Sequence, residues 1–151
     1  MGAEFGGSGN EIAYAAVRIS RKGFLIAVWT DSSGNVTQVY LVRINSRGRK
    51  LWERNFGGAG NDTANAIVKA THKGFVLAGQ TDSLGNATQV YLAGLNSRGF
   101  LAWARNYGGD GFESGNSILK AGETGWIVTG STTSYGNESQ VNLVGTNALG
   151  L

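Results

Sequence analysis

The chain of 151 residues contains no cysteine and no proline, and only one histidine and one methionine. Without cysteine, neither a disulfide framework nor a thiolate metal site can form. The first residues lack the basic and apolar regions of a signal peptide, and no apolar run approaches the roughly 20 residues of a membrane-spanning helix. Average usage of about 5% would give roughly seven prolines, so the absence of proline is compatible with an engineered or excised chain.

Positive charge is scarce in the last third of the chain, although the net charge is +3. Residues 5–55 have eight Lys and Arg against three acids, and residues 56–106 have four against two. Residues 107–151 have one base and four acids. Since Phe100, Leu101 and Leu151 interrupt the basic positions of residues 5–55, no continuous basic face is expected, and nucleic acid is not an expected partner.

Glycine is abundant, at 25 residues, and it recurs at a fixed period of 51. The segment Phe5-Gly6-Gly7 returns as Phe56-Gly57-Gly58 and again as Tyr107-Gly108-Gly109. About 29 of 51 positions are identical between the first two copies. Such a period is typical of repeat architectures, in which one supersecondary unit cannot bury its apolar face alone. We therefore treat the chain as a single domain of three units, residues 5–55, 56–106 and 107–151.

The second unit predicts four short strands and no helix. Its apolar residues alternate or run continuously in four segments separated by Gly- and Asn-containing turns, at 64–70, 74–79, 88–95 and 101–107. Gly74 closes the first turn, where a positive φ is expected. Four antiparallel strands in about 50 residues predict an all-β fold whose units are blades of a β-propeller.

The pattern F/Y-G-G-x-G-N-D/E, followed by Gly-Phe, T-D-S-x-G-N and Asn-Ser-x-Gly, resembles bacterial β-propeller repeats, the glycine-rich blades that open with GGxGxD. The resemblance covers the whole chain. It departs at Glu11 and Glu113, where Asp is expected, and at Asn142, where the other units have Tyr40 and Tyr91. Such families imply scaffolding and binding more often than one activity, so we expect neither enzymatic activity nor a cofactor.

The third unit stops at Gly150-Leu151, before the outer strand that its partners form. Propellers have four to eight blades, so three blades predict a head-to-tail homodimer that closes a six-bladed ring; the open alternative is a piece of a longer propeller. The basic first unit suits the acidic third unit. The expected interface residues are Met1, Gly2, Ala3, Glu4, Phe5, Leu143, Leu149 and Leu151.

A second hypothesis is a lectin-like, carbohydrate-binding module with one shallow site per blade. Trp29 stands opposite Gln80 and Ser131 in the repeat and could stack on a sugar, and Asp31 and Asp82 lie in the turn that follows the same strand. The competing interpretation is that these carboxylates bond to local main-chain groups, as Asx side chains do in turns. Trp52, Trp103 and Trp126 are more simply interpreted as packing residues.

No catalytic or metal-binding residue is expected. The histidine, His72, lies in a turn where the other units have Arg21 and Glu123, so it has no partners for a nucleophilic or zinc site. A carboxylate does recur at Glu11, Asp62 and Glu113, which could form a weak cation site in each unit. We favour instead a role in capping main-chain N–H groups beside the Gly-Gly segment.

Overall fold

The computed structural model describes residues 4–21, 23–32, 34, 36–70, 74–85, 87–123, 125–136 and 138–151. Every regular element in these ranges is a β-strand, which confirms the all-β class. The described part of the chain contains no helix long and apolar enough to cross a membrane.

The strands form three antiparallel sheets, of four, four and three strands, in which neighbours in sequence are neighbours in space. The first sheet consists of β1 (Glu11–Ser20), β2 (Gly23–Thr30), β3 (Gln38–Ile44) and β4 (Lys50–Phe56). The second consists of β5 (Asp62–Lys69), β6 (Phe75–Thr81), β7 (Gln89–Leu95) and β8 (Leu101–Tyr107). The third consists of β9 (Glu113–Ala121), β10 (Gly125–Thr132) and β11 (Gln140–Thr146), and it lacks a fourth strand within the described residues, as predicted.

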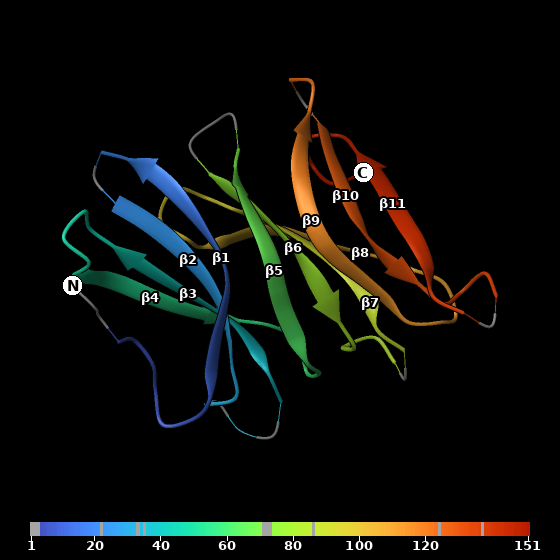
Figure 1. Cartoon of the computed structure of the whole chain (residues 1–151), viewed down its shortest axis with the longest axis horizontal. Coiled ribbons are helices and arrows are strands. Elements are labelled where there is room, and N and C mark those ends of the chain that lie inside the picture. The colour runs from blue at the N-terminus through green and yellow to red at the C-terminus, as the bar shows by residue number, and fades with distance from the viewer. Residues whose placement is uncertain are drawn as a thin grey trace.

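The sheets lie side by side, with β1, β5 and β9 next to one another across the molecule (Figure 1). Each of these first strands carries a bulge at the same repeat position, that of Tyr14, Asn65 and Asn116. At the second bulge the Asn65 amide donates to the Gly115 carbonyl oxygen at 3.0 Å. Since a bulge bends a strand and increases its twist, the repeated bulge curves the first strand of every unit in the same way.

The hydrophobic core lies between the sheets and not within any one of them. Leu25, Leu41 and Leu77 are fully buried between the first and second sheets. Val76, Leu92 and Val128 are buried between the second and third sheets. Both faces of the second sheet are therefore covered, which explains why β6 and β7 are almost continuously apolar.

The outer strands pack through tryptophan against a glycine turn of the next unit. Trp52 of β4 lies over Gly99, and Trp103 of β8 lies over Gly150, so that a Cβ atom at either glycine would collide with an indole ring. Trp126 is buried in the core between the second and third sheets. The interpretation of these three tryptophans as packing residues is confirmed.

The turns differ from the prediction at one glycine. Gly74 does not have the expected positive φ; a side chain there is excluded because its Cβ would collide with the Leu95 carbonyl oxygen. By contrast, Gly48, Gly99 and Gly150 have φ values of +80°, +79° and +72°. His72 and Met1, Gly2 and Ala3 lie outside the described residues.

Candidate functional site

A polar cluster ties the Gly-Gly loop of each unit to the end of that unit's second strand. In the first unit, one Glu11 oxygen accepts hydrogen bonds from the Gly7 N–H at 2.9 Å and from the Ser32 hydroxyl at 2.6 Å. The Thr30 hydroxyl donates to the same oxygen at 3.0 Å. Ser32 in turn accepts from the Gly9 N–H at 3.0 Å, so Glu11 and Ser32 together tie Gly7 and Gly9 of the loop to the end of β2.

The same cluster recurs in the other two units with its carboxylate buried. Asp62, 1% exposed, accepts from the Gly58 N–H at 2.5 Å and from the Ser83 hydroxyl at 3.3 Å. Glu113, 2% exposed, accepts from the Gly109 N–H at 3.1 Å and from the Thr132 hydroxyl at 2.9 Å. A buried carboxylate is tolerated only where such donors replace water.

Asp31 and Asp82 hold the asparagine of the same loop. Both oxygens of Asp31 accept bonds from Asn10, one from its main-chain N–H at 2.6 Å and one from its side-chain amide at 2.8 Å. Asp82 makes the equivalent pair of bonds to Asn61. Both carboxylates thus bond to a loop of their own unit, but across 21 residues of sequence and partly to a side chain, and not to the neighbouring main-chain groups expected of an Asx turn.

Hydrogen bonding to the charged form favours that form. The Ser32 hydroxyl, followed by the Gly7 N–H, lowers the pKa of Glu11. The side-chain amide and the N–H of Asn10 lower the pKa of Asp31. Within the described ranges no three His, Asp or Glu side chains gather in a way that could hold a metal ion. The contacts of these carboxylates hold the Gly-Gly loops in place.

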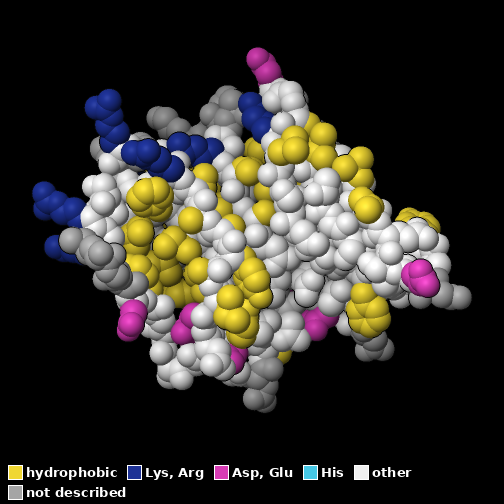
Figure 2. All heavy atoms as spheres, in the orientation of Figure 1, with side chains coloured by type: hydrophobic (Ala, Val, Ile, Leu, Met, Phe, Trp, Pro, Cys, Tyr) yellow, Lys and Arg dark blue, Asp and Glu magenta, His cyan; other side chains and the backbone are white. Residues whose placement is uncertain are grey.

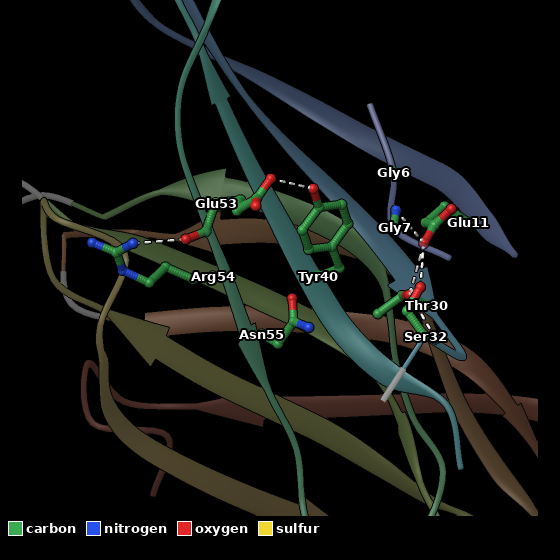
Figure 3. Close-up of a pocket in the computed structure, with 9 residues that line it drawn as sticks. All are labelled: Gly6, Gly7, Glu11, Thr30, Ser32, Tyr40, Glu53, Arg54 and Asn55. Atoms are coloured by element: carbon green, nitrogen blue, oxygen red, sulfur yellow. Dashed lines mark hydrogen bonds between the residues drawn. The ribbon is translucent and has the colours of Figure 1, made fainter. Parts of the chain in front are cut away.

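A hollow opens beside the cluster in each unit. In the first unit it has a volume of about 260 Å³ and lies between the Gly6-Gly7 loop, Tyr40 of β3 and Asn55 of β4 (Figure 3). Here the Tyr40 hydroxyl donates to Glu53 at 2.7 Å, and burial raises the pKa of Tyr40. A hollow of about 440 Å³ lies beside Asp62, Tyr91 and Asn106 in the second unit.

The third hollow lacks one wall. It has a volume of about 330 Å³ and is lined by Glu113 and Thr132 and by residues of β11, among them Asn142. Nothing in the described chain takes the place that β4 and β8 occupy in the other units, so no equivalent of Asn55 or Asn106 lines it.

The predicted ligand residues do not line these hollows. Trp29 is half-buried in β2, where it pairs with Ile12 and Val39. Asp31 and Asp82 point to their loop asparagines. Sequence reasoning missed the lining residues Tyr40 and Asn55; the repeat of Asn55 as Asn106 was the available signal.

The third sheet leaves an apolar face uncovered. Leu41 and Leu92 are both 0% exposed, whereas Leu143, at the same repeat position, is 67% exposed. Similarly, Val39 and Val90 are buried, and Val141 is 85% exposed. The residues that pack each earlier sheet against its successor are therefore present on the third sheet without a partner among the described residues.

No sheet of the described chain packs against the opposite face of the first sheet. Val28, Tyr40 and Val42 form a small buried cluster there, with Phe5 packed against it, and Phe24 is 36% exposed. Phe5 holds the repeat position of Phe56 and Tyr107, which pack into the two junctions between sheets. Hydrophobic side chains gather on the side of the molecule formed by β1 to β4 (Figure 2).

The other residues predicted to line an interface lie at the ends of the described chain. Glu4 is exposed immediately before Phe5. Leu149 and Leu151 are 56% and 67% exposed in the turn after β11, where the Asn147 side chain accepts bonds from both of their N–H groups. Leu151 holds the position of Phe100, whose ring lies 4.8 Å from the Arg54 guanidinium of the preceding unit.

Comparison with known proteins gives no match, either to a model of a protein family or to a curated protein.

Proposed function

We propose that this protein is a non-enzymatic, self-assembling scaffold in which two copies join head to tail and close a ring of six sheets. In this arrangement the sheets are blades of a β-propeller, with β1, β5 and β9 innermost. The observation that carries the proposal is the contrast between Leu41 and Leu92, which are fully buried, and Leu143, which is 67% exposed at the same repeat position.

The two open faces are complementary because each resembles one side of a junction that already exists. At the internal junctions, the position of Leu143 packs against the next sheet at the position of Tyr40 and Val42. The third sheet of one copy would meet the first sheet of the other in the same way. A heterologous contact repeated twice about a two-fold axis is a closed solution, so neither face would stay exposed.

The apolar area of the uncovered face would favour association. At about 25 cal/mol per Å², covering an apolar face of ~500 Å² contributes ~12 kcal/mol before the costs of association. That gross term is comparable with the net stability of a typical domain. The charges also favour this order, because the first unit has a balance of +5 and the third a balance of −3. Opposite charges guide encounter and suppress wrong pairings more than they add affinity.

The N-terminal segment would complete the third sheet of the other copy. In the first sheet Val39 pairs with Phe56, and in the second Val90 pairs with Tyr107. The same register would pair Val141 with Phe5 of the second copy, and residues 1–5 would then run beside Leu143. This arrangement is supported by the position of Phe5, which already packs against the first sheet where a preceding outer strand would end.

The test is the solution mass, measured by light scattering after size exclusion at several concentrations. We expect a species near twice the chain mass of 15.8 kDa. Leu143→Asp should give a monomer, whereas Leu84→Asp should not. Leu84 is a matched control because it is 69% exposed but lies in a turn away from both faces. A wild-type monomer at high concentration would refute the proposal and favour a piece of a longer propeller.

A second candidate is carbohydrate binding, which the recurrence of a polar hollow in every unit favours. In the second unit Asn106 contributes a buried side-chain oxygen that has no hydrogen-bond partner among the described residues. A glycan array with Asn106→Ala and Trp29→Ala variants tests this function. Loss of glycan binding in Asn106→Ala alone would identify the hollow as the binding site. Loss in Trp29→Ala alone would identify the Trp29 ring as the surface on which the sugar stacks.

A further inference from the structure

The two junctions inside the chain share a main-chain link. At the first, the Asp62 N–H donates to the Thr37 carbonyl oxygen at 2.9 Å. At the second, the Glu113 N–H donates to the Thr88 carbonyl oxygen, also at 2.9 Å. In both cases the loop between the second and third strands of one unit binds the first residue of the next unit's first strand.

An asparagine strengthens the link at the first junction. The Thr37 N–H donates to the Asn61 side-chain oxygen at 2.9 Å, and the Thr37 hydroxyl donates to the same oxygen at 3.2 Å. The Asn61 amide nitrogen donates a hydrogen bond to Asp82 at 2.8 Å. Asp82 therefore orients the amide so that its oxygen faces Thr37.

The first unit presents the same arrangement without a partner. Asp31 binds the Asn10 N–H and its amide nitrogen, which orients the exposed Asn10 as Asp82 orients Asn61. Within the described part of the chain, no donor bonds to the Asn10 side-chain oxygen, and no loop carbonyl outside its own sheet accepts the Glu11 N–H.

The third unit presents the complementary loop. Ser139 holds the repeat position of Thr37 and Thr88 and offers the same N–H, hydroxyl and carbonyl groups. It is exposed, whereas both threonines are half-buried at their junctions. Val141, two residues further along the chain, is 85% exposed, so a sheet packed there would come close to this loop.

We propose that Asn10 and Glu11 of one copy bind the main chain of Ser139 of a second copy, an inference that rests on the head-to-tail association proposed above. The Glu11 N–H donates to the Ser139 carbonyl oxygen, and the Ser139 N–H and hydroxyl donate to the Asn10 side-chain oxygen. These directional bonds supply what two apolar faces lack, namely a single register of the sheets.

The first test is the dimer dissociation constant of Asn10→Ala. The substitution removes two of the three bonds at each junction, which should weaken each junction roughly 5- to 30-fold and a ring with two junctions roughly 25- to 900-fold. Asn61→Ala removes the same bonds inside the chain. This control should lower the urea midpoint of the isolated chain. It should leave the dissociation constant within about threefold of wild type, because the bonds of Asn61 lie within one chain and distant sites contribute independently.

The second test follows the main-chain bond, which no side-chain substitution removes. Amide hydrogen exchange by NMR should show the Glu11 N–H protected in the dimer and unprotected after dilution. The Asp62 and Glu113 N–H groups should remain protected at every concentration, because their acceptors lie in the same chain.

The results of these tests distinguish the polar link through Asn10 and Glu11 from head-to-tail association itself. A wild-type dimer whose affinity Asn10→Ala leaves unchanged, or whose Glu11 N–H exchanges rapidly, would refute the polar link and leave head-to-tail association intact. A wild-type chain that stays monomeric would refute both. A weakened Asn10→Ala dimer with a protected wild-type Glu11 N–H would support both.

Discussion

The contact between Trp52 and Gly99 offers a matched pair of substitutions. Gly48 and Gly99 hold the same repeat position and have φ values of +80° and +79°. A Cβ at Gly99 would collide with the Trp52 indole, whereas a Cβ at Gly48 would meet nothing within 4 Å. Gly48→Ala therefore measures the backbone strain alone, and Gly99→Ala measures the strain and the collision.

The expected magnitudes follow from these two terms. An alanine in the left-handed region costs about 1–2 kcal/mol. Displacing a packed indole costs about 1–3 kcal/mol more. Gly48→Ala should therefore lower the free energy of unfolding by about 1–2 kcal/mol and Gly99→Ala by about 2–5 kcal/mol. For a chain of this size the melting temperature of Gly99→Ala should lie about 2–12 °C below that of Gly48→Ala.

The assay is urea denaturation at one protein concentration, followed by far-ultraviolet circular dichroism and tryptophan fluorescence. Repeating both glycine substitutions in a Trp52→Ala background completes a double-mutant cycle, in which the extra cost of Gly99→Ala should vanish. Equal losses for the two glycine variants in the wild-type background would refute the packing of β4 against the second unit.

Three further predictions concern the polar groups. Asp62→Ala leaves the Gly58 N–H and the Ser83 hydroxyl without their acceptor and should lower the free energy of unfolding by about 2–4 kcal/mol. As a control, substitution of the exposed Asp110 by Ala should change the free energy of unfolding by less than about 0.5 kcal/mol. Equal effects of the two variants in urea denaturation would contradict the role of Asp62 in the cluster. The pKa values of Glu11, Asp31 and Glu53 are lowered in the folded state. These carboxylates therefore stabilise the folded protein fully at a pH above their pKa values in the unfolded chain, and this contribution should be lost as the pH falls through their pKa values in the folded protein. A urea midpoint that stays constant between pH 5 and pH 3, on the order of those values, would contradict this. Burial, with a smaller effect of the Asp62 charge, raises the pKa of Tyr91 to about 12. An absorbance titration of Tyr91→Phe should therefore lack part of the late phenolate signal of the wild type, and an unchanged late phase would rule out this assignment.

The strands and turns could be predicted because their signals are local. The apolar segment at residues 101–107 coincides with β8, and the three strands of the third sheet within the described residues agree with the alignment of the repeats. The capping role of Glu11, Asp62 and Glu113 was also accessible, because each carboxylate bonds to an N–H four residues earlier. The positive φ expected at Gly74 was wrong, although Gly23 at the same repeat position has a φ of +125°. What the two glycines share is the close approach of a carbonyl about 21 residues away, of Ile44 or Leu95, which excludes a side chain and which no local pattern reveals.

The sequence by itself determined the number of units, their strands and the polar chemistry of their loops, since alternation and turn residues act within a few positions. Only the tertiary structure decided which side chains meet across the units. It brought Tyr40 and Asn55 together around a hollow, packed Phe5 against the first sheet and left Leu143 exposed while its repeats are buried. The reason is that each apolar strand face is covered by a sheet about 51 residues away, and no local pattern encodes whether that sheet is present.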